Sequence, residues 1–384
     1  MENSQQASAK VARACAGLQV RGHMQGTPAA ACAGILNQWA LADLTPWVQA
    51  KFGADENGTY LSMALSQEQA QRWAPNLDTL GLTDTLQLDT RNKVSDLTRE
   101  IVVAMLMGPV AFEFPSADEF MSAVRIRINT VLAARKTTLD FRTSEAERPQ
   151  DCWTYDDDYG FTIRPGASLI DALIKATQPE VSGALYSFSC YRASEYVILL
   201  GIAQELEHCN PPLYAALQDL WASRPIKSGK FHDVFLREQG TMEDPLPPRY
   251  FVPGDRTWFR NPDSVSAEAS GFEGSWVMYL GDGLFSNFWK HDAPFTLMDK
   301  CLEIYHWRNG LYFDAQGEER IDEAKVAELV AETRKNPDEV TRICNIMERY
   351  REARGIYTDA GGCIDTTREF ARWVCPGTSD LVLP

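Results

Sequence analysis

The sequence predicts an α+β fold, because its helical and strand-like patterns are segregated along the chain. Helical periodicity comes first, a helix that begins at a cysteine follows near the middle, and short antiparallel strands come after it. The chain has 384 residues, of which 45% are hydrophobic and 23% are charged. These values are ordinary for a folded globular protein, and the length exceeds that of one average domain.

The clearest helix is predicted over residues 117–136. Ser116 and Glu119 have the spacing of a capping box. Apolar residues then recur at helical intervals, at Phe120, Met121, Val124, Ile128, Val131 and Leu132. A shorter helix is predicted near residues 168–176.

Two further helices are predicted near the end of the chain. Asn336 followed by Pro337 is a strong helix start, because Asn caps the free N–H groups and Pro fits the first position. Thr366 with Glu369 has capping spacing as well, and predicts one more helix that includes Val374.

A β-hairpin is predicted between these helical regions. Residues 276–280 are apolar on both faces, as in a buried strand. Gly281, Asp282 and Gly283 then form a turn that leads into Leu284 and Phe285. Short strands are also expected on either side of the turn at residues 253–255.

The negative net charge argues against nucleic acids and membranes as binding partners. The net charge is −16, so the surface repels phosphate backbones and anionic lipids. No stretch approaches the roughly 18 apolar residues of a membrane-spanning helix. The first twenty residues lack the apolar core of a secretory signal. We therefore expect a cytoplasmic protein that binds neither nucleic acid nor membrane, with export by another route left open.

The nine cysteines form neither a disulfide framework nor a zinc motif. Their number is odd, no two are separated by just two residues, and no histidine has zinc-finger spacing. Reduced thiols are expected, and no metal site is predicted.

Cys190 has the sequence context of a nucleophile. A strand-like run at residues 185–189 precedes it, and Tyr196, Val197 and Leu200 continue at helical spacing. A helix N-terminus carries partial positive charge and free N–H groups, which stabilise a thiolate and an oxyanion. The competing interpretation is a structural cysteine that only packs in the core.

The stretch 95–310 resembles the small spore-associated transglutaminases of Bacillus. The resemblance depends on several short motifs that agree in order and spacing. They are Gly108-Pro109-Val110, Phe112, Arg125, Arg127, Asn129, Ala133-Ala134, Lys136-Thr137, Leu185 to Ala193 around Cys190, Gly254-Asp255, Phe259, Asn261-Pro262, Leu280-Gly281 and Asp299-Lys300.

This resemblance implies a bacterial protein-glutamine γ-glutamyltransferase with an NlpC/P60-like cysteine hydrolase fold, in which an antiparallel sheet packs on the helix that carries the cysteine. The implied reaction forms a thioester between the cysteine and a protein glutamine. A lysine amine then yields an isopeptide crosslink, or water yields deamidation. The implied partners are therefore proteins that supply glutamine and lysine side chains, and no cofactor or metal is required.

The chain departs from the family at the positions that assist the cysteine. The family has a glutamate at the start of the central strand and a histidine one hairpin later, where this sequence has Ser275 and Asn287. A second family glutamate corresponds to Ser189. Glu273 and His291 are the nearest replacements, and Asn287 can still orient a base. The predicted catalytic set is therefore Cys190, Glu273, His291 and Asn287.

Four segments are expected: a disordered N-terminus over 1–34, an N-terminal extension over 35–94 with helical pieces at 35–52 and 66–73, a catalytic domain over 95–310, and a helical C-terminal extension over 311–384. Two other functions fit the same residues. One is a cysteine amidohydrolase or peptidase that acts on a partner protein. The other is a binding module that has lost catalysis.

Overall fold

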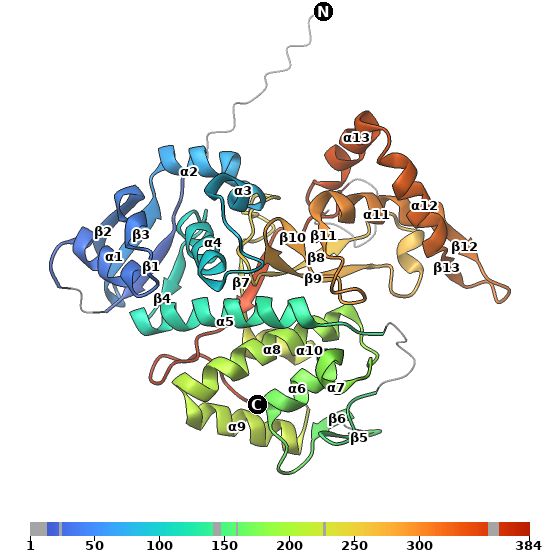
Figure 1. Cartoon of the computed structure of the whole chain (residues 1–384), viewed down its shortest axis with the longest axis horizontal. Coiled ribbons are helices and arrows are strands. Elements are labelled where there is room, and N and C mark those ends of the chain that lie inside the picture. Colours follow the sequence, from blue (N-terminus) through green and yellow to red (C-terminus); the bar gives the residue numbers. More distant parts are fainter. Residues whose placement is uncertain (1–13, 23–24, 141–146, 159, 226–227, 352–360) are drawn as a thin grey trace, which may run out of the picture.

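The structure is a computed structural model that describes residues 14–22, 25–140, 147–158, 160–225, 228–351 and 361–384. Helix α5 (Ala117–Lys136) crosses the middle of the molecule (Figure 1). The N-terminal elements lie at one of its ends, α8 (Cys190–Cys209) packs along it, and the main sheet lies beside both. The mixed α+β class is confirmed.

The N-terminal elements form a sheet with helices packed around it. The strand order is β2-β3-β1-β4, with β1 antiparallel to β3 and parallel to β4. The elements are β1 (Leu18–Arg21), α1 (Pro28–Asn37), β2 (Val48–Asp55), β3 (Gly58–Leu65), α2 (Gln67–Trp73), α3 (Leu82–Leu86), α4 (Val94–Leu106) and β4 (Phe112–Phe114).

The prediction of disorder over 1–34 is wrong for the part that forms β1 and the start of α1, while residues 1–13 and 23–24 lie outside the described part. β1 is hydrogen-bonded on both sides, and its Leu18 and Val20 side chains are fully buried. Short strands of this kind are ordered by their neighbours. The helix predicted over 35–52 is also wrong from Val48 onward, where β2 pairs with β3.

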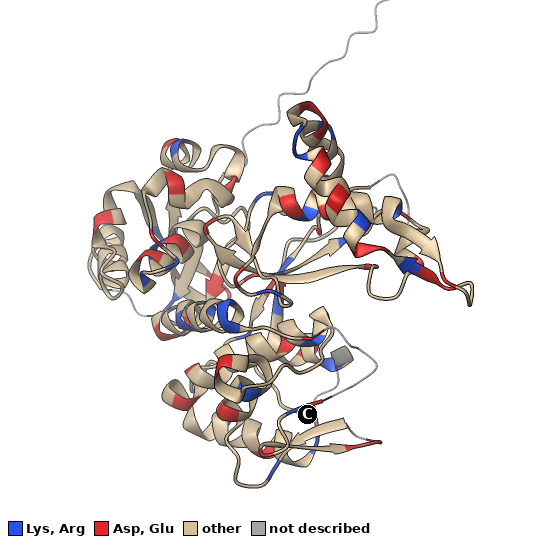
Figure 2. Cartoon of the chain, turned by 45° about the vertical axis from the view of Figure 1, so that its right-hand side comes forward, with Lys and Arg blue, Asp and Glu red and all other residues tan. Residues whose placement is uncertain are grey.

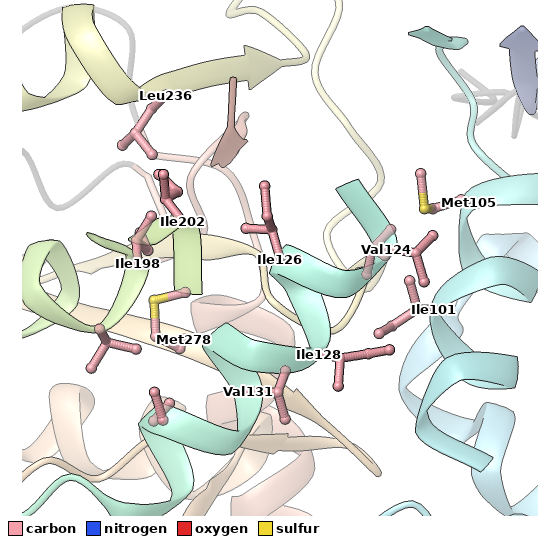
Figure 3. Close-up of a cluster of buried hydrophobic side chains, with 14 of the residues drawn as sticks. Ile101, Met105, Val124, Ile126, Ile128, Val131, Ile198, Ile202, Leu236 and Met278 are labelled. Carbon is pink, nitrogen blue, oxygen red and sulfur yellow. The ribbon is translucent and has the colours of Figure 1, made fainter. Parts of the chain in front are cut away.

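Helix α5 has the bounds predicted for it and forms the centre of the core. Figure 3 shows Val124, Ile126 and Val131 of α5 between residues of α4 on one side and of α8 on the other. Ser116 accepts a hydrogen bond from the backbone N–H of Glu119. The Glu119 carboxylate does not complete a capping box, because it accepts from the backbone N–H groups of Val374 and Cys375.

The main sheet has six strands in the order β11-β10-β9-β8-β14-β7. The predicted hairpin is confirmed as β9 and β10, joined by the turn at residues 281–283. Gly281 and Gly283 both have positive φ in this turn, which glycine adopts without strain. The strands are β7 (Leu236–Gln239), β8 (Arg256–Arg260), β9 (Gly274–Gly281), β10 (Leu284–Phe285), β11 (Phe295–Thr296) and β14 (Arg368–Ala371).

The C-terminal segment is part of this sheet, so the prediction of a helical extension over 311–384 is only partly correct. It contains a hairpin, β12 (Leu311–Phe313) with β13 (Glu319–Ile321), then α12 (Glu323–Thr333) and α13 (Pro337–Met347) with its predicted Asn336 cap. The helix predicted after Thr366 is wrong. That region is β14, which lies between β7 and β8 and is antiparallel to both.

The remaining elements lie beyond α8 or flank the sheet. They are β5 (Trp153–Asp156), β6 (Gly160–Ile163), α6 (Leu169–Thr177), α7 (Pro179–Ser182), α9 (Pro211–Ser223), α10 (Ser228–Phe235) and α11 (Leu297–Gly310). In the described ranges, no helix combines the length and the apolar composition that crossing a bilayer requires. Figure 2 shows acidic and basic residues on all these layers, with acidic bands on the helices of the C-terminal segment.

The turn after β9 is anchored by a buried carboxyl from α4. Glu100 accepts hydrogen bonds from the Tyr279 hydroxyl at 3.1 Å and from the backbone N–H of Asp282 at 3.1 Å. Burial raises the pKa of Glu100 from 4.5 to about 7. Because the folded pKa is the higher one, the stability that this carboxyl contributes is complete below about pH 4 and is lost as the pH rises through 7.

We expect Glu100→Gln to gain stability relative to the wild type as the pH rises from 4 to 8, by on the order of 3 kcal/mol. Denaturant unfolding at the two pH values measures this difference. Glu113→Gln, which changes an exposed glutamate of β4, is the control and should show no such trend. A constant difference between Glu100→Gln and wild type at both pH values would contradict the argument.

Candidate active site

Cys190 is the first residue of α8 and is half-buried. Ser189 caps the helix, and its hydroxyl accepts a hydrogen bond from the backbone N–H of Arg192 at 3.2 Å. The backbone N–H groups of Cys190 itself and of Tyr191 interact with the sulfur. The helix start therefore directs its free N–H groups at the thiol, as the sequence predicts.

A third N–H group reaches the sulfur from the sheet. Strand β9 packs against α8, and the backbone N–H of Trp276 interacts with the Cys190 sulfur. β10 pairs with β9 at Tyr279 and Gly281, near the other end of the strand. β10 does not extend as far as Trp276, so the Trp276 N–H is not used in pairing with β10 and can face the Cys190 sulfur at the start of α8. Groups in this arrangement can also donate to an oxyanion formed next to the sulfur.

Burial works against ionisation of the thiol. It raises the pKa of Cys190 above the ordinary value of 9.0, whereas the three backbone N–H groups and the charge of Lys300 lower it. The net shift is upward, which differs from the sequence-based expectation that the helix N-terminus dominates. The physical reason is that the expectation included the helix dipole but not the desolvation that the aromatic surroundings impose.

Two cavities meet at Cys190. The smaller, of about 210 Å³, extends toward β10 and α11, and the larger, of about 520 Å³, extends toward β8. Trp276 lines both cavities. Its ring is stacked on that of Trp258, with the ring centres 6.1 Å apart, and lies edge-on to that of Tyr191, with the ring centres 5.3 Å apart. Further aromatic residues of the smaller cavity are Phe272, Phe288, Trp289, Phe295 and Trp307. The sulfur is thus accessible from two directions between apolar walls.

Two of the predicted partners share these cavities with the cysteine. Glu273 lines the larger one, and its carboxylate accepts a hydrogen bond from the Gly271 N–H at 3.4 Å. Asn287 lines the smaller one, and its amide donates to the Ala293 carbonyl at 3.0 Å while accepting from the Trp289 N–H at 3.2 Å. Asn287 therefore braces the loop between β10 and β11.

His291 lies elsewhere. Among the residues that the structure describes, the linings of these two cavities do not include it. Its side chain is exposed and its ring nitrogen contacts the Thr138 hydroxyl, on the strand-like segment that follows α5. Asn287 braces the loop that carries His291 through its hydrogen bonds to Trp289 and Ala293.

The two serines at the family's glutamate positions flank the sulfur. Ser275 lines the smaller cavity and Ser189 the larger. A serine hydroxyl is no base near neutral pH, so these positions supply hydrogen bonds but no charge.

Sequence reasoning missed the charged pair on α11. Lys300 and Glu303 both line the smaller cavity, and their Nζ and Oε2 atoms are 2.8 Å apart. The residues follow the capping box of Thr296 and Asp299, which begins the helix. The signal in the sequence was the Asp299-Lys300 pair in register with the family, which indicated similarity but no position relative to Cys190.

Several motif residues serve the framework around the site. Arg127 of α5 and Asp255 form a buried ion pair at 2.8 Å, and Asp255 also accepts from the Val252 N–H at 2.7 Å. This fixes the segment that enters β8. Asn261 donates to the Phe272 carbonyl at 3.0 Å and its backbone N–H donates to the Glu273 carbonyl, so it anchors the segment that leads into β9 beside Cys190.

The family model for protein-glutamine gamma-glutamyltransferase matches residues 81–352, which is well over half of the chain. The chain belongs to this family. It is therefore an acyltransferase that acts on protein glutamine, and the matched range of this transglutaminase contains Cys190, both cavities and the Lys300–Glu303 pair. The resemblance first seen in its short motifs is confirmed.

Comparison with solved structures finds a transglutaminase from Geobacillus stearothermophilus, solved without its C-terminal extension. It is 20% identical, covers 56% of this chain and 98% of its own, and superposes with a TM-score of 0.39. No curated protein sequence matches this transglutaminase. In the described ranges, no group of three or more His, Cys, Asp or Glu side chains is arranged to hold a metal ion.

Proposed function

We propose that Cys190 is the nucleophile of this transglutaminase and that the product is an isopeptide bond between a glutamine and a lysine of protein substrates. The observation that carries the proposal is the position of the sulfur. It lies at a helix N-terminus, beside three backbone N–H groups, where two cavities meet. A thioester intermediate needs such a reachable sulfur, with donors placed for the oxyanion.

The first half of the reaction forms the thioester. The Cys190 sulfur gives its proton to a base and attacks the γ-carbonyl carbon of glutamine. The carbonyl oxygen becomes an oxyanion that accepts from the N–H groups of Tyr191 and Trp276. The C–S bond forms, the C–N bond breaks, and the nitrogen takes the proton back from the base and leaves as ammonia.

The second half transfers the acyl group. The lysine amine attacks the thioester carbon and gives a proton to the same base. The new C–N bond forms, the C–S bond breaks, and the proton returns to sulfur. Water in place of the amine yields glutamate, which is deamidation. The apolar walls around the sulfur favour the amine by limiting water.

We propose Glu273 as the base, with Asn287 as a positioning residue for the loop beside the sulfur. Glu273 is the titratable partner predicted from the sequence that also lines a cavity with Cys190. His291 is the less supported candidate, since it contacts Thr138 on the outside. The architecture of a cysteine-bearing helix packed on an antiparallel sheet is consistent with the NlpC/P60-like class that the resemblance implies.

The test of the function is incorporation of a fluorescent primary amine into a glutamine-rich protein such as casein, with ammonia release measured in parallel. We expect both signals from the wild-type protein. Ammonia release without amine incorporation would replace the transferase with an amidohydrolase. Neither signal, from a protein that is folded by circular dichroism, would favour the non-catalytic binding module.

We expect Glu273→Gln to lower kcat/KM for amine incorporation by roughly 10²–10⁴-fold, because the amide cannot accept the thiol proton. Steady-state kinetics measures the loss. Glu268→Gln is the matched control, since Glu268 is an exposed carboxylate on the same connection between β8 and β9 that lines neither cavity. Equal activity of the two variants would exclude Glu273 as the base.

A further inference from the structure

A lysine side chain is buried in the wall of the smaller cavity. Lys300 is only 3% exposed, although lysine is almost never fully buried without a partner. Its ammonium lies 2.8 Å from the Glu303 carboxylate and 3.7 Å from the centre of the Phe295 ring. A carboxylate and an aromatic face together replace the water that the charge has lost.

The lysine is held in place by the helix that carries it. α11 begins with the reciprocal capping box of Thr296 and Asp299, directly before Lys300. Asp299 also forms an ion pair with Arg334 at the end of α12. Lys300 therefore projects from a first turn that is fixed both by its cap and by an ion pair to α12.

Lys300 and Cys190 line the same cavity of about 210 Å³. Among the described residues that line the two cavities, Lys300 alone carries a positive charge. The other charged or titratable side chains in those linings are Tyr191, Glu273, Glu303 and Glu323. Two arginines of the neighbouring elements line neither cavity and form ion pairs of their own, Arg256 with Glu369 and Arg192 with Glu195.

We propose that the Lys300–Glu303 pair sets the charge on Cys190: the Lys300 ammonium stabilises the thiolate, and Glu303 holds the ammonium and offsets part of its field. This role rests on the proposed function of Cys190 as nucleophile. It supplies the positive charge that a histidine partner gives in other cysteine enzymes, at a site where Asn287 replaces histidine. The direct effect of Lys300 on the thiol has the required sign.

The measurement is the rate of Cys190 alkylation by iodoacetamide from pH 6 to pH 11, followed by peptide mass spectrometry. We expect Lys300→Met to move the profile up by about one pH unit, a roughly tenfold slower reaction at fixed pH, and Lys300→Arg to restore most of the rate. Lys325→Met, an exposed lysine of α12, is the matched control and should leave the profile unchanged.

Glu303→Gln gives the discriminating result. Glutamine still accepts a hydrogen bond from Lys300 but carries no negative charge, so we expect the profile to move to lower pH, opposite to Lys300→Met. A merely structural pair would move both variants in the same direction, and that outcome overturns the proposal. An unchanged profile in folded Lys300→Met, checked by thermal unfolding, overturns it as well.

The alkylation readout does not depend on transferase activity. A Lys300-dependent profile without amine incorporation would reject the proposed function and retain the charge effect. Amine incorporation with an alkylation profile that does not change when Lys300 is replaced would support the proposed function and reject the charge effect of Lys300.

Discussion

Replacement of Cys190 by alanine is expected to reduce amine incorporation by at least about a thousandfold, because the thioester cannot form without the sulfur. The helix start, the Trp276 N–H and both cavities remain in this variant, so binding and oxyanion donors are kept. The loss therefore falls on kcat. Folding should be unaffected, since the sulfur only borders the cavities and forms no part of the close-packed core.

The assay uses a fluorescent amine, and the matched control is Cys344→Ala. Cys344 is also a half-buried free thiol, but it lies on α13 and lines neither cavity. Full activity in the control with none in Cys190→Ala assigns the chemistry to one sulfur. Substantial incorporation by Cys190→Ala would refute the nucleophile assignment outright.

Replacement of Glu369 by alanine is expected to destabilise the protein by about 3–5 kcal/mol, a large fraction of the stability of a typical domain. Glu369 on β14 forms an ion pair with Arg256 on β8, whose side chain is 1% exposed. The guanidinium also lies over the rings of Trp276 at 4.3 Å and Tyr191 at 4.9 Å. Without Glu369 this charge stays buried, with the Ser194 hydroxyl at 3.4 Å among its remaining contacts.

Urea unfolding measures the effect, with Glu339→Ala as the matched control. Glu339 pairs with Arg342 on the surface of α13, where the two side chains are 37% and 48% exposed. Its loss should cost little stability, because water and salt screen an ion pair at the surface. A similar small cost for Glu369→Ala would mean that water reaches Arg256. Because Tyr191 and Trp276 flank Cys190, we also expect Glu369→Ala to lower transferase activity in the folded fraction.

Local patterns were sufficient where one stretch of sequence decides the structure. Helix α5, the hairpin of β9 and β10, and the helix start at Asn336 follow from periodicity, turn glycines and caps. These signals act between residues a few positions apart. The same is true of Cys190 at the start of α8, since the change from a strand-like run to helical spacing is local.

Local patterns failed where distant segments compete for the same residues. The spacing of Thr366 and Glu369 fits a helix cap. In the folded protein the segment instead forms a strand that pairs with both β7 and β8, and Glu369 forms an ion pair with the buried Arg256. Glu119 is expected to complete a capping box, but its carboxylate accepts hydrogen bonds from the backbone N–H groups of residues 374 and 375 instead. Hydrogen bonds and charge pairs of this kind join residues more than a hundred positions apart.

The sequence by itself determined the fold class, the family and the cysteine that we assign as nucleophile, because these depend on ordered motifs and on spacing within single elements. Only the tertiary structure decided which charges surround that cysteine. It placed Glu273 in one cavity and Lys300 with Glu303 in the other, and left His291 outside both. Burial and electrostatic fields are set by whatever chain segments meet in space, and sequence distance carries little information about that.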